Sequence, residues 1–143
     1  MPRADVGAQV GLSEAAVRKR VERLLREGVI RIVAIPEPNK VGLTTIAIVG
    51  IRVVPGRATQ VVERLKALKS VRWIGYTTGQ YDIIVELMLS SPQHLLKYLN
   101  DDIGSIEGIN TTETSIVLEI AKRTYAVLHD EESDAKTAPR SVA

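Results

Sequence analysis

The chain of 143 residues contains no cysteine and only two histidines. Without cysteine it can form no disulfide, no thiolate metal site and no cysteine nucleophile. The two histidines, His94 and His129, are too few and too widely separated for a dedicated zinc site or a histidine-based catalytic site. Redox and zinc chemistry are therefore excluded, and we expect no metal and no cofactor.

Long hydrophobic runs are also missing. No apolar stretch approaches the roughly 20 residues of a membrane span, and residues 1–10 lack the apolar core of a signal peptide. These absences predict a cytoplasmic protein that does not bind a membrane. The hydrophobic fraction of 45% and the charged fraction of 25% are those of an ordinary globular chain with one or two small domains.

Charge is unevenly distributed along the chain. The net charge of +2 is small, but residues 1–31 hold seven basic and four acidic side chains. This segment therefore has a net charge of +3, and the remainder of the chain has a net charge of −1. A local excess of positive charge is the usual electrostatic signature of a nucleic-acid contact. The N-terminal segment is therefore the part of the chain to search for a DNA-binding element.

The stretch from Gly11 to Ile30 predicts a turn followed by an amphipathic helix. Ser13 is a candidate N-cap, Glu14 suits the positive end of the helix dipole, and Gly28 suits the left-handed conformation that follows a last turn. Helical spacing separates an apolar core stripe from a cationic face. The core stripe contains Val17, Val21, Leu24 and Leu25, and the cationic face contains Ala15, Lys19, Arg23 and Arg26.

A shorter helical pattern precedes this helix, with Val6 and Val10 four residues apart and Gly11 between the two segments. This is the layout of a helix-turn-helix, whose second helix enters the major groove of DNA. Small side chains can approach base edges, and basic ones can donate to phosphates and guanine. An ordinary solvated helix face is the alternative. We predict the DNA-binding residues to be Ser13, Ala15, Ala16, Arg18, Lys19 and Arg23.

The remainder of the chain predicts a second unit. Residues 29–35 alternate as a β-strand, and the proline-rich break at residues 36–39 marks a domain boundary. Beyond it the elements follow the order β-α-β-β-α-β, which right-handed crossovers arrange as a ferredoxin-like antiparallel sheet with both helices on one face. The predicted strands are 44–54, 71–77, 82–89 and 109–125, and the predicted helices are 57–69 and 92–103. The fold class is α+β.

The helices of such a sandwich cover only one face of the sheet, although both alternating faces of its strands carry apolar residues. We expect the uncovered face to be buried against a second copy in a two-fold homodimer, which would also pair two DNA-reading helices. The apolar residues behind this expectation are Ile46, Ile48, Ile83, Val85, Ile116 and Leu118.

Three segments, LSEAAVRKRVERLLREGVI, TTGQYDIIVEL and TTETSIVLE, closely resemble the Lrp/AsnC (feast/famine) family of prokaryotic transcription regulators. The resemblance covers about residues 4–128. It implies a winged helix-turn-helix domain at residues 1–35 and a ligand-sensing, dimerising domain at residues 36–128. Residues 129–143 are charged and poor in apolar side chains, and this composition predicts a disordered tail. The implied partners are double-stranded DNA, an amino acid or related small-molecule effector, and further copies of the chain, in a homodimer or up to an octamer.

In that family the turn that matches Gly79-Gln80-Tyr81-Asp82 lies near the effector pocket between subunits. The resemblance therefore implies Gly79 as a close backbone approach and Asp82 as the acidic residue of the motif. An amino acid needs an acidic acceptor for its ammonium group and N–H or hydroxyl donors for its carboxylate. We predict the effector-binding residues to be Thr77, Thr78, Gly79 and Asp82. The alternative is that all four are only hairpin turn residues.

One departure from the family pattern concerns the N-terminus. Family members have a further helix before the first one here, whereas only three residues, Met1 to Arg3, precede it. The winged helix-turn-helix is therefore expected to be truncated, or the start site to lie further upstream. In a truncated domain we expect four apolar side chains to be partly exposed, those of Val6, Val10, Val17 and Val21. A stand-alone metabolite sensor or subunit partner without DNA binding is accordingly the alternative function.

An enzyme on the same scaffold is the third hypothesis. Asp101 and Asp102 are adjacent at a helix end and point in different directions, which suits neither a metal clamp nor a paired-carboxylate mechanism. The glycines lack the spacing of a phosphate-binding loop. No convergent set of acid and base groups can be assembled, so we predict that the protein is not an enzyme.

Overall fold

The computed structural model describes residues 2–125, and within them the chain forms two compact units that divide between Val41 and Gly42. The boundary predicted at residue 36 lies in the segment that precedes this division. The predicted disordered tail at residues 129–143 lies outside the described residues. No helix in the described range is long and apolar enough to cross a bilayer.

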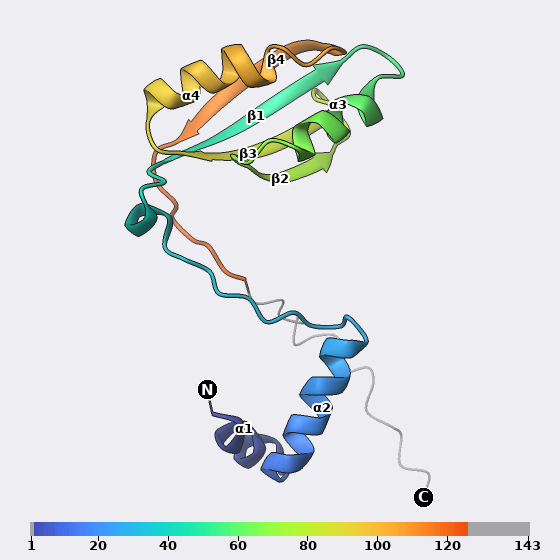
Figure 1. Cartoon of the computed structure of the whole chain (residues 1–143), viewed down its shortest axis with the longest axis vertical. Coiled ribbons are helices and arrows are strands. Elements are labelled where there is room, and N and C mark those ends of the chain that lie inside the picture. The colour runs from blue at the N-terminus through green and yellow to red at the C-terminus, as the bar shows by residue number, and fades with distance from the viewer. Residues whose placement is uncertain (1, 126–143) are drawn as a thin grey trace, which may run out of the picture. The chain divides into compact units, whose positions relative to one another are not determined.

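The first unit contains helices α1 (Arg3–Val10) and α2 (Glu14–Arg26) and the short 3-10 turn η1 (Pro38–Val41) (Figure 1). Gly11 adopts φ 67° between the two helices, as a helix-turn-helix requires. The Ser13 hydroxyl accepts a hydrogen bond of 3.3 Å from the N–H of Ala16, so the predicted N-cap is confirmed. A Cβ at Gly7 would lie 2.5 Å from the carbonyl oxygen of Leu12, so glycine is needed at this position inside α1, against which the following turn packs.

The core of this unit is thin. Val17 is only 4% exposed, and in residues 2–41 Gly7 is the one other buried residue. Val21 and Leu24 are half-buried, but the prediction that Leu25 belongs to the core is wrong, because its side chain is 38% exposed. Leu25 points about 80° around α2 from Val17, beyond the side of α2 on which α1 packs.

The predicted strand at residues 29–35 is not formed. Gly28, at φ 71°, ends α2 as expected, and residues 29–35 form no strand. A β-strand needs a hydrogen-bonded neighbour, and within residues 2–125 the only sheet is the one formed by β1 to β4, with which this segment does not pair. The alternating pattern instead leaves Val29, Ile32 and Val33 exposed.

The second unit is a four-stranded antiparallel sheet of order β2-β3-β1-β4 with both helices on one face (Figure 1). This confirms the ferredoxin-like prediction and the α+β class. Its strands are β1 (Thr45–Val53), β2 (Val71–Tyr76), β3 (Ile83–Leu89) and β4 (Ile109–Val117). Its helices are α3 (Ala58–Lys66) and α4 (Pro92–Tyr98), the latter continued by the π-helical turn η2 (Leu99–Ile103).

Alternate positions of the two central strands make the core, because successive side chains of a strand point to opposite faces. Apolar side chains from α3 and α4 pack on the same sheet face, so one cluster joins the helices to the sheet. Fully buried members of this cluster are Ala47, Val49, Ile51, Val61, Leu65, Ile83, Val85, Leu87, Leu89 and Ile103.

We call the opposite sheet surface the bare face, because α3 and α4 both pack on the other side of the sheet. Strand register places two rows of residues across it, Gly75-Ile84-Gly50-Glu113 and Trp73-Glu86-Ile48-Ser115. Of the apolar residues expected here, Ile46 and Ile48 do lie on this face. Ile83 and Val85 are instead in the core, Ile116 pairs with Ala47 on the helix side, and Leu118 follows the end of β4.

Two elements end earlier or differently than predicted. The last strand stops at Val117 rather than near residue 125, because Val117 pairs with Ile46 at the start of β1 and no strand remains beyond it. The helix predicted to reach residue 103 does begin with Ser91 as N-cap and proline at its first position. Its last turn widens, so that the Gly104 N–H donates to the Leu99 carbonyl at 2.8 Å.

Candidate DNA-binding and effector sites

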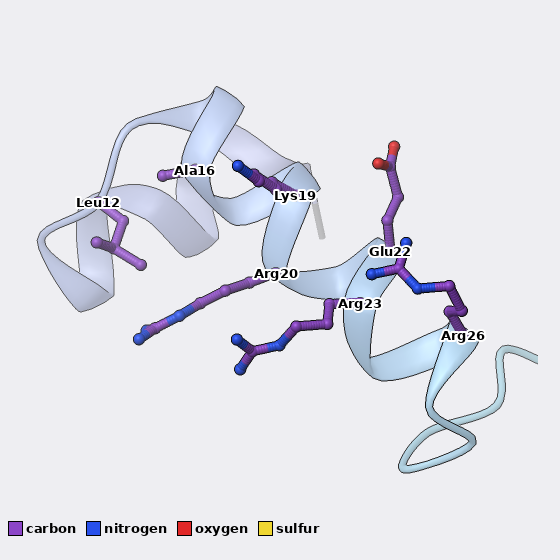
Figure 2. A pocket seen from close by; sticks show the side chains of 7 residues that line it. All are labelled: Leu12, Ala16, Lys19, Arg20, Glu22, Arg23 and Arg26. Atoms are coloured by element: carbon purple, nitrogen blue, oxygen red, sulfur yellow. The ribbon is translucent and has the colours of Figure 1, made fainter.

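A hollow of about 460 Å³ lies along α2 and the turn before it (Figure 2). Basic side chains outnumber acidic ones four to one around it, and in Figure 2 the Arg20 and Arg23 side chains extend in the same direction from the helix. The lining residues are Leu12, Ala16, Lys19, Arg20, Glu22, Arg23 and Arg26. The hollow is therefore a cationic surface with small and apolar side chains at its N-terminal end.

Three predicted DNA-binding residues, Ala16, Lys19 and Arg23, line this hollow together. Ser13 acts as the N-cap of α2, and Ala15 is exposed. Arg18 is exposed but does not line the hollow, because one helical step turns it about 100° from Lys19.

Sequence reasoning missed two cations of this site. Arg20 and Arg26 line the hollow although neither was assigned to the DNA-binding set. Their positions could have been found from spacing, because Ala16, Arg20 and Arg23 follow the i, i+4, i+7 pattern of one helix side and Arg26 lies three residues beyond Arg23.

The cations of the hollow are available for an anionic partner. Arg23 Nε lies 3.8 Å from Glu27 Oε1, but both side chains are more than half exposed, so this ion pair is weak. Guanidinium and ammonium groups so placed can donate to DNA phosphates without losing a strong internal partner.

The turn between β2 and β3 contains the four predicted effector-binding residues. The Thr77 N–H donates to the Asp82 carbonyl at 3.0 Å, and the Thr77 hydroxyl donates to the Tyr81 carbonyl at 2.7 Å. Gly79 has φ 96°, a left-handed conformation that favours glycine. These bonds close the base of the turn and leave Thr78 and Gly79 exposed at its tip.

Asp82 fastens this turn to the neighbouring strand β1. Its Oδ2 accepts a hydrogen bond of 2.9 Å from the Val53 N–H, and its own N–H donates to the Ile51 carbonyl at 3.0 Å. Arg52 adds a third link, because its Nε donates to the Gln80 carbonyl at 2.7 Å. Asp82 thus has a structural role, and its carboxylate retains capacity to accept further hydrogen bonds.

Donors for an anion lie at the tip of the same turn. The backbone N–H groups of Thr78 and Gly79 make no hydrogen bond within residues 2–125, and both residues are exposed. A carboxylate oxygen is a suitable acceptor for such groups. The turn therefore combines one acidic side chain with open backbone donors.

Tyr81 is a residue of this region whose role the sequence pattern did not indicate. Its hydroxyl donates a hydrogen bond to Glu113 Oε2 on β4. This hydrogen bond is the main cause that raises the pKa of Tyr81, with desolvation and the Glu113 charge as smaller causes. Tyr81 therefore connects the turn to the opposite edge of the sheet.

Two family models match this chain. The model described as winged helix-turn-helix DNA-binding matches residues 1–31, and the model described as Lrp/AsnC ligand binding domain matches residues 46–127. The two matches coincide with the helical unit and the sheet unit of the structure.

Individual proteins are similar over most of the chain. An uncharacterized HTH-type transcriptional regulator of Pyrococcus furiosus is 36% identical over 124 residues, which cover 86% of this chain and 84% of that protein. The HTH-type transcriptional regulator LrpA of Pyrococcus horikoshii is 30% identical over 122 residues, which cover 85% of this chain and 86% of that protein.

Solved structures share the fold. Escherichia coli AsnC superposes with a TM-score of 0.81 at 28% identity, covering 88% of this chain and 86% of that one. A transcriptional regulator of Neisseria meningitidis, solved as a complex with L-Met, gives a TM-score of 0.83 at 18% identity. The superposition covers 90% of this chain and 85% of that one.

Proposed function

Because this chain belongs to the Lrp/AsnC family of transcriptional regulators, we propose that it is an amino-acid-responsive DNA-binding regulator that acts in the cytoplasm as a homodimer or larger oligomer. Its relatives are HTH-type transcriptional regulators, not enzymes. The observation that carries the DNA-binding role is the cationic hollow on α2, lined by Lys19, Arg20, Arg23 and Arg26.

In this proposal the N-terminal half of α2 enters the major groove of DNA. The small Ala15 and Ala16 let the helix approach the base edges, while Lys19 and Arg23 contact phosphates on one side of the groove. Arg18 projects from a different side of α2 and is exposed, so it is the cation assigned to a base edge.

The test is the salt dependence of DNA binding by the full chain. Each phosphate neutralised by a lysine or arginine contributes about 0.9 to the slope of log K against log salt. We expect a steep slope that falls in α2 variants. Lys40→Ala is the matched control, because Lys40 is an exposed cation of η1 outside the hollow and its removal should leave the slope unchanged. A slope near zero for the parent chain would remove the DNA-binding role.

The homodimer is proposed from surfaces that the single chain leaves uncovered. The bare face carries Ile46, Ile48 and Ile84 in its centre, and Trp73 is exposed at its edge. A second copy supplies the same apolar surface around a two-fold axis. It would also present two α2 helices to a two-fold DNA site, whereas a single helix-turn-helix contacts only one half-site.

The effector is proposed to bind at the turn of residues 77–82. Asp82 would accept from the ammonium group, and the N–H groups of Thr78 and Gly79, with the hydroxyl of Thr78, would donate to the carboxylate. The regulator of Neisseria meningitidis, which has the same fold, was solved with L-Met. An effector between subunits can shift assembly only by its differential affinity for the two assemblies.

A second candidate function is a metabolite sensor that does not bind DNA. The thin core of the first unit favours it, because Val10 and Leu25 are exposed rather than packed. The salt-dependence experiment separates the two candidates. Effector binding without measurable DNA binding would support the sensor, whereas a steep salt slope would support the regulator.

A further inference from the structure

A carboxylate lies in the middle of the bare face. Glu86 on β3 pairs across the sheet with Trp73 on β2 and with Ile48 on β1, and its neighbours on the same face of β3 are Ile84 and Met88. All four neighbours are apolar. Charged side chains are depleted at the centre of protein interfaces, so a carboxylate here needs a specific explanation.

Arg123 provides the opposite charge. Its Nη2 lies 3.2 Å from Glu86 Oε2, and the two side chains are only 28% and 22% exposed. The other ion pairs in the described residues, Arg23 with Glu27 and Lys66 with Glu63, are more than half exposed. Arg123 belongs to residues 118–125, which follow β4, so the ion pair ties that segment to the bare face.

Resting on the proposed homodimer, in which a second copy covers the bare face, we infer that Arg123 is the residue that allows this face to associate, because it neutralises Glu86 at the centre of the contact. An uncompensated carboxylate buried by a partner would lose its hydration and strongly disfavour association. Arg123 neutralises Glu86 before the two copies meet. A two-fold partner then brings the same compensated Glu86–Arg123 pair and its apolar neighbours to the contact.

The two members of the pair are not equivalent. Without Arg123, Glu86 remains fixed in the centre of the sheet and cannot reach water once the face is covered. Without the carboxylate, the long Arg123 side chain lies on a segment outside the sheet and can turn toward solvent. Removal of Arg123 therefore weakens the dimer much more than neutralisation of Glu86 does.

The experiment is sedimentation equilibrium of the full chain and of three variants. Arg123→Ala should raise the dimer dissociation constant about 100-fold, in the range found when one partner of a buried charge pair is truncated. Glu86→Gln should raise it less than about tenfold, and the double variant Glu86→Gln with Arg123→Ala should return close to the Glu86→Gln value, because it leaves no unpaired charge. Lys122→Ala is the matched control, an exposed cation one residue away that makes no ion pair in residues 2–125.

Circular dichroism and thermal unfolding of each variant separate loss of association from loss of folding. A dimeric parent whose Arg123→Ala variant dimerises equally well overturns this inference and leaves the proposed function standing. A double variant as weak as Arg123→Ala also overturns it, because charge compensation would then not be the cause. A monomeric parent chain overturns the proposed homodimer together with this inference.

Discussion

The phenol ring of Tyr81 lies directly over the backbone of Gly50. A Cβ at position 50 would be 2.7 Å from carbon atoms of that ring, a distance that real side chains do not tolerate. Gly50 has no positive φ, so the glycine is required by this close approach and not by its backbone conformation. The contact joins the turn of residues 77–82 to the central strand β1 on the bare face.

We predict that Gly50→Ala lowers the free energy of unfolding by about 1–3 kcal/mol, because the added methyl group forces the Tyr81 ring away from β1. Urea denaturation of the full chain measures this loss. In a Tyr81→Ala background the same substitution should cost little, since the ring is absent. Equal costs in both backgrounds would show that the ring does not determine the requirement for glycine.

The hydrogen bond from Tyr81 to Glu113 predicts a pH dependence. This bond raises the pKa of Tyr81 above its ordinary value of 10.0, so it stabilises the folded state fully at pH below that value. The contribution is lost as the pH rises through the raised folded pKa. Ultraviolet titration of tyrosinate should therefore show one group that ionises late.

Two variants identify that group. Tyr81→Phe should remove the late step, and Glu113→Ala should move it toward the ordinary tyrosine range. If the late step persists in Tyr81→Phe, it belongs to another tyrosine and the hydrogen bond does not control the titration.

Local features of the first unit were predictable from sequence, because they depend on residues close together in the chain. The Ser13 cap spans three residues, and Gly28 ends α2 through its own backbone conformation. The strand expected at residues 29–35 failed for the opposite reason, since strand formation depends on a neighbour that no local pattern specifies.

For the candidate sites, too, the local features were predictable from sequence and the long-range contacts were not. Composition and periodicity located the cationic helix and the turn, and the resemblance to a family assigned their roles. The links that hold the bare face are distant in sequence: Tyr81 and Glu113 are 32 positions apart, and Glu86 and Arg123 are 37 apart. Register does not specify either pairing, because Tyr81 lies in the turn before β3 and Arg123 follows the end of β4. Both depend on how distant segments fold against the sheet, which local hydrophobic alternation does not determine.

We predict that Lys19→Ala and Arg23→Ala each weaken DNA binding and reduce the salt slope by about 0.9, as expected for one lost phosphate contact. Both side chains line the same cationic hollow, so their effects should act on all DNA sequences alike. Fluorescence anisotropy over a range of salt concentrations measures affinity and slope together.

Arg18→Ala should behave differently from these two variants. Its loss should relax sequence preference by about 1–3 kcal/mol at one base position, because Arg18 is assigned to a base edge. Binding to a set of single-base variants of a selected site measures this change. If Arg18→Ala reduces affinity uniformly for all sites, Arg18 contacts phosphate and the orientation proposed for α2 is wrong.

The last prediction concerns Asp82, whose carboxylate has a structural partner in the Val53 N–H and is also proposed to receive the effector ammonium group. Asp82→Asn keeps an oxygen acceptor for the Val53 N–H but removes the negative charge, so it should preserve stability and abolish effector binding. Asp82→Ala should lose both effector binding and the link to Val53, with a stability cost of about 0.5–1.5 kcal/mol for this exposed hydrogen bond. Calorimetry against the twenty amino acids, beside thermal unfolding of each variant, separates the two roles. An Asp82→Asn variant that binds the effector as well as the parent would leave Asp82 with the structural role alone.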